Sequence, residues 1–167
     1  MRKAIAVAAG LLVLAAVNWN IYGRERLLET GRVVLLELAP VDPRSLMQGD
    51  YMALRFRAAD QGLGRGRGTT GADDGYIVVR VGEHAVGTFA RREGGEPLAE
   101  GEVRLRYRLR EGQVKFATNA YFFQEGTARK YASARYGEFR VAPNGDLLLT
   151  HLVGADFRRL GANKPGV

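Results

Sequence analysis

The stretch EVRLRYRLR, residues 102–110, decides the fold class of this chain. Apolar side chains occupy every second position, at Val103, Leu105, Tyr107 and Leu109, and arginines fill the positions between them. Successive side chains of a strand point to opposite faces, so this alternation predicts a strand with one buried and one solvent-facing side. The arginines of the outward face are Arg104, Arg106, Arg108 and Arg110.

Further strand-like runs lie on both sides of this stretch. The expected strands cover residues 32–39, 51–57, 76–81, 84–91 and 112–123, together with the two arms of a hairpin within 137–153. Gly82-Glu83, Glu111-Gly112 and Pro143–Asp146 are expected as tight turns. The sequence therefore predicts a mainly β (β-rich α+β) domain with one antiparallel, barrel-like sheet.

Two segments break the strand pattern. Residues 125–135, EGTARKYASAR, carry Ala128, Tyr131 and Ala132 at helical spacing and predict a short helix, the one helix expected after the amino-terminal segment. Residues 58–75 are glycine-rich and contain a formal G-x-G-x-x-G at 66–71. A dinucleotide site needs a strand before that motif and a helix after it, whereas here a strand follows, so a surface loop is expected.

The amino terminus contains an uncharged run of 19 residues from Ala4 to Tyr22. As a helix it would be roughly 28 Å long, close to the hydrocarbon thickness of a bilayer. Trp19 and Tyr22 stand at its far end, where aromatic side chains meet the membrane interface. The run predicts a transmembrane anchor helix that ends at Thr30-Gly31; a cleaved signal peptide is the alternative.

This anchor sets the expected domain organisation. We expect an anchor and stalk at 1–31, an exported β-rich domain at 32–160 and a flexible tail at 161–167. Because the amino-terminal tail is short and carries Arg2 and Lys3, the simpler insertion exports the carboxyl domain. In a bacterium the protein would be a single-pass protein of the inner membrane with a periplasmic domain.

Composition narrows the chemistry. The 167 residues carry a net charge of +7 and no cysteine, so disulfides and thiolate metal sites are excluded. The two histidines, His84 and His151, are not in a metal-ligand spacing. No metal and no other cofactor is therefore expected.

The stretch VDPRSLMQG, residues 41–49, has the features of a short helical corner. Asp42 can cap a helix, Pro43 suits its first position, and Gly49 suits a left-handed stop. Asp42 and Asp50 could instead form an acid/base pair. The capping role favours a structural interpretation.

The following string GDYMALRF, residues 49–56, resembles the signature of the bacterial GDYXXLXY family. Gly49, Asp50, Tyr51 and Leu54 match, and Phe56 replaces the final tyrosine. The block YFFQEGTARKYASARYGEFRV, residues 121–141, is similar to a second shared block of that family. The resemblance implies a membrane-anchored domain that associates with multi-pass membrane proteins, without an established active site to carry over.

The stretch PVDPRSLMQ, residues 40–48, which precedes GDYMALRF, also resembles that family's lead-in. The motif residues that could take part in binding follow from this lead-in and the two blocks. They are Asp42, Pro43, Arg44, Gly49, Asp50, Tyr51, Leu54, Phe56, Glu125 and Gly126.

The Leu46 to Asp50 turn also resembles the nucleophile region of membrane-anchored signal peptidases. In those enzymes a serine lies eight residues before the glycine, and the matching residue here is Val41. A Ser-Lys dyad would require Ser45 to meet Lys115. The resemblance implies a similar turn of the chain without the catalytic activity of the peptidases.

Three functions remain as hypotheses. The first is a non-enzymatic binding or assembly module for an integral membrane protein. The second is a membrane-anchored hydrolase that uses Ser45 with Lys115, or Asp42 with Asp50. The third is contact with anionic lipid through the arginine face of residues 102–110, because nucleic acid is out of reach of an exported domain.

Overall fold

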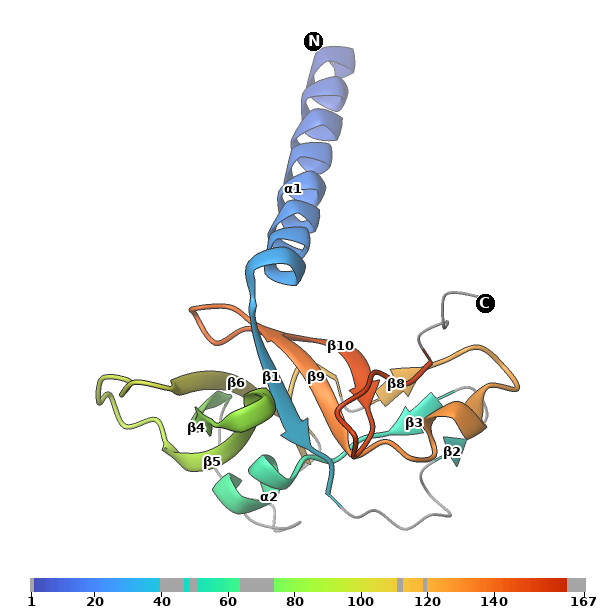
Figure 1. Cartoon of the computed structure of the whole chain (residues 1–167). Helices are drawn as coiled ribbons and strands as arrows, with labels where there is room; N and C mark the ends of the chain where they lie inside the picture. The colour runs from blue at the N-terminus through green and yellow to red at the C-terminus, as the bar shows by residue number, and fades with distance from the viewer. Residues whose placement is uncertain are drawn as a thin grey trace.

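The computed structural model describes residues 2–39, 47–48, 51–63, 74–110, 113–118 and 120–161, and only the backbone at 2, 4–6, 8, 47, 48, 63 and 113. One long helix leads into a mainly β domain (Figure 1). The elements are α1 (Arg2–Thr30), β1 (Arg32–Glu37), β2 (Met47–Gln48), β3 (Tyr51–Ala53), α2 (Arg57–Leu63), β4 (Gly75–Val81), η1 (Glu83–Ala85), β5 (Val86–Arg92), β6 (Glu102–Arg110), β7 (Gln113–Lys115), β8 (Ala120–Phe122), η2 (Ala128–Tyr131), β9 (Tyr136–Val141) and β10 (Leu147–Val153).

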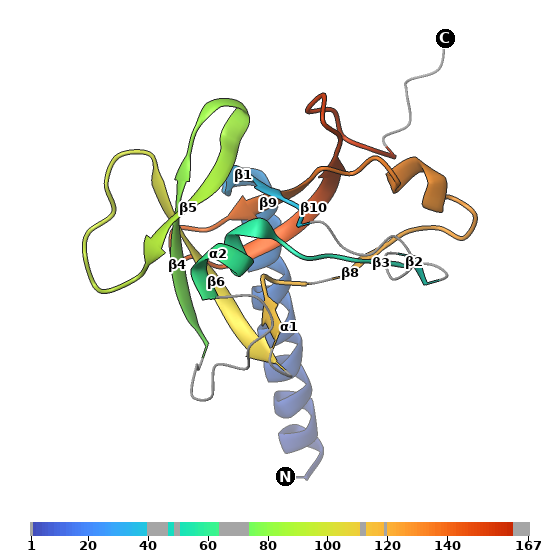
Figure 2. The ribbon, with the colours of Figure 1, turned by 90° about the horizontal axis from the view of Figure 1, so that it is seen from below.

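Seven of the strands form one curled sheet in the order β10-β9-β1-β5-β4-β6-β7 (Figure 2). The mainly β prediction is confirmed, but the expectation of one antiparallel sheet is wrong in two respects. β1 and β5 are parallel, because the chain crosses through β3, α2 and β4 before β5 returns beside β1. Strands β2, β3 and β8 form a separate small sheet.

The period-two alternation of the sequence matches the burial of the strands. In β6, Val103, Leu105 and Tyr107 are buried. In the segment 51–57, Met52, Leu54 and Phe56 are buried, as strand alternation requires of one face. The regular strand is shorter than predicted, however, because it ends at Ala53 and α2 begins at Arg57.

Helix α2 is the element that the sequence prediction missed. Its glycine-rich surroundings favoured a loop from residue 58, yet Ala58 and Ala59 are buried against the sheet. At Gly62 an added Cβ would lie 2.8 Å from the ring of Phe89, so the missing side chain permits a close approach to β5. Residues 64–73, including the G-x-G-x-x-G string, lie outside the described residues.

The helix expected at 125–135 is only the four-residue 3-10 turn η2. Gly126, with φ +78°, turns the chain before it. After it, the Arg135 amide donates to the Val153 carbonyl at 2.8 Å. Because sheet bonding resumes at residue 135, no room remains for a longer helix.

The turns are confirmed in part. Gly145 takes φ +88° in the β9–β10 hairpin, as its place after Asn144 predicts. In the β4–β5 hairpin the positive φ values fall on His84 (53°) and Ala85 (60°), so β5 begins two residues later than predicted. The strand expected over 112–123 divides at Ala117, with φ 52°; β7 stays on β6 and β8 joins β3.

Helix α1 extends away from the β domain (Figure 1). It ends where predicted: the Gly31 amide donates to the Leu27 carbonyl at 2.9 Å, and Arg140 Nη1 of β9 donates to the Gly31 carbonyl at 3.1 Å. The expected helix is therefore present. A membrane span is not found in it: over the residues whose side chains the structure describes, no helix has the length and apolar character to cross a bilayer.

A buried carboxylate joins the end of the described chain to the sheet. Glu138 of β9 is 5% exposed and receives Arg159 Nε and Nη2, both at 2.8 Å. The Thr150 hydroxyl donates to it at 3.1 Å, and His151 Nδ1 lies 3.5 Å away. Burial acts to raise the pKa of Glu138, but the hydrogen bonds and charge of Arg159 outweigh burial and lower it.

This ion pair predicts an acid-sensitive contribution to stability. Arg159→Gln should lower the free energy of unfolding at pH 7 by about 1–3 kcal/mol, because it leaves Glu138 buried without its cation. Since the folded pKa of Glu138 is depressed, the contribution is complete above the unfolded value near 4.5 and is lost as pH falls through the folded pKa. Urea unfolding from pH 7 to pH 3 measures this.

The matched control is Arg158→Gln, whose side chain is 86% exposed and pairs only with Asp156 at 3.7 Å within the described residues. It should change stability little at any pH. If the difference in unfolding free energy between Arg159→Gln and the natural chain stays constant down to pH 3, the depressed pKa assigned to Glu138 is contradicted.

Candidate functional site

The two sequence blocks with family character meet in the structure. Strand β3, from the first block, pairs antiparallel with β8, from the second, in the register Tyr51↔Phe122 and Met52↔Tyr121. A separate bridge joins Phe56 to Leu38 of the chain that leaves β1. Segments about seventy residues apart thus form one surface.

The inner side of the first block is part of the core. Leu54 and Phe56 are each 2% exposed. The Phe56 ring lies 5.2 Å from that of Phe139 and 6.1 Å from that of Phe116, both edge-on. At Gly137 an added Cβ would lie 2.9 Å from the Phe56 ring. Leu54 and Phe56 therefore act through packing, and a hydroxyl at position 56 would need a partner inside the core.

The outer side of the small sheet carries an aromatic pair. The rings of Tyr51 and Phe122 lie 5.8 Å apart and tilted at 42°. Phe122 is 73% exposed, and Tyr51 is half-buried. β8 stands at the edge of this sheet, with no strand on its far side among the described residues. We call Tyr51, Phe122 and the free edge of β8 the aromatic edge.

The other side of β8 supports the aromatic edge from within. Tyr121 and Phe123 each place a ring 5.3 Å from the ring of Tyr131 in η2. Burial, together with the neighbouring Tyr131, raises the pKa of Tyr121. β8 therefore stands on a layer of packed rings, which hold Phe122 at the surface on a fixed base.

Glu125 and Gly126 form the turn after this layer. Gly126 has φ +78°, and the Thr127 hydroxyl donates to the Gln124 carbonyl at 2.6 Å. Glu125 is exposed and has no ion pair in the part of the chain that the structure describes. Their positions give them a turn-forming role next to the aromatic edge.

The arginine face of β6 is mostly paired with acidic side chains. Arg104 lies 3.4 Å from Glu93, Arg106 lies 3.3 Å from Asp146, and Arg110 lies 3.0 Å from Asp74. Partial burial acts to raise the pKa of Asp74, but the hydrogen bonds from Arg110 and the Leu109 amide outweigh it and lower that pKa. Arg108 has no ion pair within the described residues.

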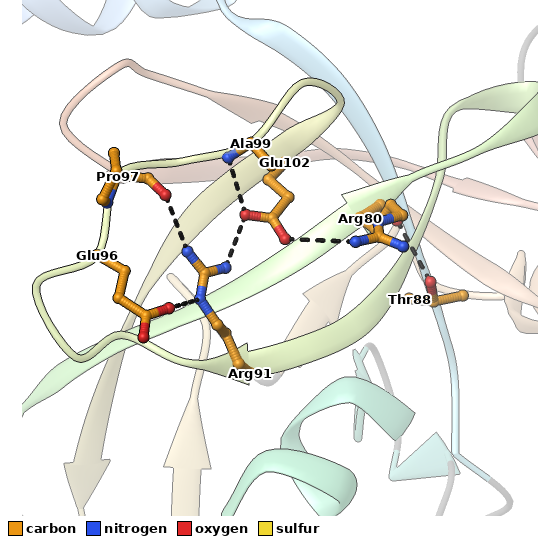
Figure 3. Close-up of polar contacts among 7 residues, drawn as sticks. All are labelled: Arg80, Thr88, Arg91, Glu96, Pro97, Ala99 and Glu102. Carbon is orange, nitrogen blue, oxygen red and sulfur yellow. Dashed lines mark hydrogen bonds and ion pairs between the residues drawn. The ribbon is translucent and has the colours of Figure 1, made fainter.

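A second acidic centre, at the start of β6, links strands β4, β5 and β6 (Figure 3). Glu102, at the start of β6, is 9% exposed and accepts from the Ala99 amide at 3.1 Å and from Arg91 Nη1 at 2.6 Å. Arg80 lies 3.7 Å away and Arg91 also reaches Glu96 at 3.1 Å. The Ala99 hydrogen bond, followed by that of Arg91, lowers the pKa of Glu102. Glu102 is buried and bonded to groups of its own domain, which indicates a structural role.

Several predicted site residues cannot be placed. Asp42, Pro43, Arg44, Ser45, Gly49 and Asp50 lie outside the described residues. The pairs Ser45–Lys115 and Asp42–Asp50 therefore stay predictions. The helical corner expected over 41–49 is wrong at its carboxyl end, because Met47 and Gln48 form strand β2 and pair antiparallel with Met52 and Tyr51 of β3. Among the residues that are described, no three His, Asp or Glu side chains gather as metal ligands would.

Comparison with known proteins gives a family match alone. The family model described as GDYXXLXY protein matches residues 13–152, which is most of the chain. Neither a curated protein nor a solved structure matches. The matched range includes both sequence blocks, the curled sheet except the last residue of β10, and the larger part of α1.

Two phenylalanine substitutions distinguish the core residues of this site from its surface residues. Phe56→Ala should lower the free energy of unfolding by about 3–5 kcal/mol, because it leaves a cavity between Phe139 and Phe116. Phe122→Ala should change it by less than about 0.5 kcal/mol, because the ring is already in solvent. Urea denaturation of the two variants measures the difference, and equal losses would show that Phe122 is part of the core.

Proposed function

The chain belongs to the GDYXXLXY family, and from this premise we propose that it is a non-enzymatic binding module held at a bacterial inner membrane. In this proposal α1 is the tether, the β domain is exported to the periplasm, and the aromatic edge binds an integral membrane protein. The Tyr51–Phe122 pair, in which Phe122 is exposed and Tyr51 half-buried, is made by both family blocks together and is the observation that carries the proposal.

The surroundings of α1 support the tether. Leu12 is 71% exposed and Trp19 is 81% exposed, and the apolar side chains around them are uncovered on every side. Exposure of an apolar helix to water on all sides is unfavourable, so such a helix is expected to be covered by lipid or by another protein. The run from Ala4 to Tyr22 has the length that a bilayer requires.

The chemistry of the aromatic edge supports a protein partner. Exposed aromatic rings with a fixed base are typical anchors of protein interfaces, because they bury much area and lose little conformational freedom. The free edge of β8 can also accept a strand from a partner, which would add backbone hydrogen bonds to the ring contacts. Neither feature supplies a nucleophile or an acid/base pair.

The tether narrows the choice of partner. A domain that follows directly from a membrane helix stays within a short distance of the bilayer. Its effective concentration is then highest for proteins of the same membrane. The periplasmic side follows from Arg2 and Lys3 before the apolar run, which favour retention of the amino terminus in the cytoplasm.

Photo-crosslinking in cells tests this proposal. A benzophenone amino acid at position 122 should give a crosslinked band with an integral membrane protein, and the protein should sediment with membranes after carbonate washing. Tyr51→Ala combined with Phe122→Ala should abolish co-purification of that partner at unchanged abundance, since it removes both rings of the pair.

The matched control is Leu98→Ala, which removes another exposed apolar side chain, 42% exposed, from a loop outside the small sheet. It should leave co-purification unchanged. Recovery of the protein in the carbonate supernatant would contradict the tether, and absence of any crosslink from position 122 would contradict the binding surface.

A further inference from the structure

A cleft lies between α1 and the arginine face of β6. Its volume is about 570 Å³, and its lining includes Trp19 and Arg24 of α1, Arg106 and Arg108 of β6, and Asn144 and Asp146 of the β9–β10 turn. The cleft thus joins the helix to the domain at the level where α1 leaves the sheet. A volume of this size lies in the range that small-molecule sites occupy, about 300–1,000 Å³.

The charge of the cleft is positive. Three arginines face one carboxylate, Asp146, and that carboxylate is already paired with Arg106 at 3.3 Å. Within the described residues neither Arg24 nor Arg108 has an ion pair. Arg24 Nε donates to Asn20 Oδ1 at 3.2 Å, which orients the guanidinium and leaves its terminal nitrogens free.

The polar atoms opposite these arginines are already bonded to one another. Asn144 Nδ2 donates to Asp146 Oδ2 at 2.9 Å, and the Thr118 hydroxyl donates to the Ala120 carbonyl at 2.9 Å. Among the charged side chains of the lining, Arg24 and Arg108 therefore keep donors that no ion pair of the described residues uses. A site with free guanidinium donors, whose one carboxylate is already paired, favours an anion, and guanidinium matches phosphate oxygens in pairs.

The position along α1 favours a particular source of phosphate. Trp19 is 81% exposed and lies about one and a half turns before Arg24. Tryptophan prefers the boundary between hydrocarbon and headgroups, so an α1 that spans a bilayer would place Arg24 and the cleft at headgroup level. Leu147 and Leu148 also line the cleft and offer apolar surface beside the arginines.

We propose that this cleft binds the phosphate headgroup of an anionic membrane lipid, with Arg24 and Arg108 as its direct ligands. The assignment of the phosphate to a lipid rests on the proposed tether; the phosphate chemistry rests on the cleft alone. Bound lipid would fix the angle between α1 and the β domain, because the two arginines come from the two parts. The domain would then present its aromatic edge at a defined height above the bilayer.

The chain has a built-in reporter for this binding. Its single tryptophan, Trp19, lines the cleft, so its fluorescence should change when a headgroup enters. We would titrate the full chain in non-ionic detergent micelles with phosphatidylglycerol, phosphatidylcholine and inorganic phosphate. Phosphatidylglycerol should shift the fluorescence saturably, phosphatidylcholine should bind at least about tenfold more weakly, and inorganic phosphate should compete only weakly.

Three variants locate the site. Arg24→Gln and Arg108→Gln should each weaken phosphatidylglycerol binding about tenfold, because each removes a charge-assisted contact. The control Arg158→Gln removes an exposed arginine outside the cleft and should leave binding unchanged. Circular dichroism checks that each variant is folded. We expect them to fold, because neither cleft arginine has an ion pair in the described chain.

Each remaining outcome overturns the proposal. Equal weakening by all three variants would mean a general effect of surface charge, and full competition by inorganic phosphate would mean a free-anion site. No saturable response to phosphatidylglycerol would exclude the site. The micelle titration does not depend on membrane sedimentation. A protein that fails the carbonate-wash test of the tether could therefore still bind phosphatidylglycerol in micelles, and the two failures can be told apart.

Discussion

The structure depends on the packing of Phe56 into the open side of the curled sheet. Its ring meets Phe139 of β9 and Phe116 beyond β7, which lie towards opposite ends of the strand order. A half-barrel would otherwise expose its apolar interior to water. The segment from Met52 to Ala59 fills this interior with its buried side chains, which are Met52, Leu54, Phe56, Ala58 and Ala59. At 2% exposure the Phe56 ring is as fully removed from water as the strands around it.

This arrangement gives the motif segment two sides with separate roles. The inward positions Leu54 and Phe56 close the core, and the outward position Tyr51 stands beside Phe122 on the aromatic edge. Because β3 also pairs with β8, packing in the core fixes the geometry of the surface. A binding site built on a rigid base of this kind loses little entropy when a partner docks. The cleft beside α1 is similarly composite, with one arginine from the helix and two from β6.

The sequence predicted what depends on local period and turn chemistry. The alternation in β6, the Gly145 turn and the helix end at Gly31 all follow from residues within a few positions of one another. It did not predict α2, because the glycine that allows its approach to Phe89 reads as a loop former until the partner strand is known. The division between β7 and β8 escaped prediction for the same reason. Only tertiary pairing decides that residues before Ala117 stay on β6 and residues after it join β3.

Prediction of the candidate site from the sequence was limited in the same way, because it too depends on tertiary contacts. The sequence singled out the motif residues but could not divide them into inner and outer faces, and Phe122 gave no signal beyond its place in the second block. The arginine face was visible as a pattern, whereas the carboxylates that pair Arg104, Arg106 and Arg110 lie 11–40 residues away along the chain. Only the structure singles out Arg108 as the member without such a partner among the described residues.

The most direct test of the account is native-state hydrogen exchange on the amides that anchor the motif segment. The Ala39 amide donates to the Arg55 carbonyl at 2.8 Å, and the Ala59 amide donates to the Phe56 carbonyl at 3.0 Å. If this segment closes the core, both amides should exchange only through global unfolding, with the same free energy as the β1–β9 amides. Exchange by local opening, while the β1–β9 amides remain protected, would contradict it.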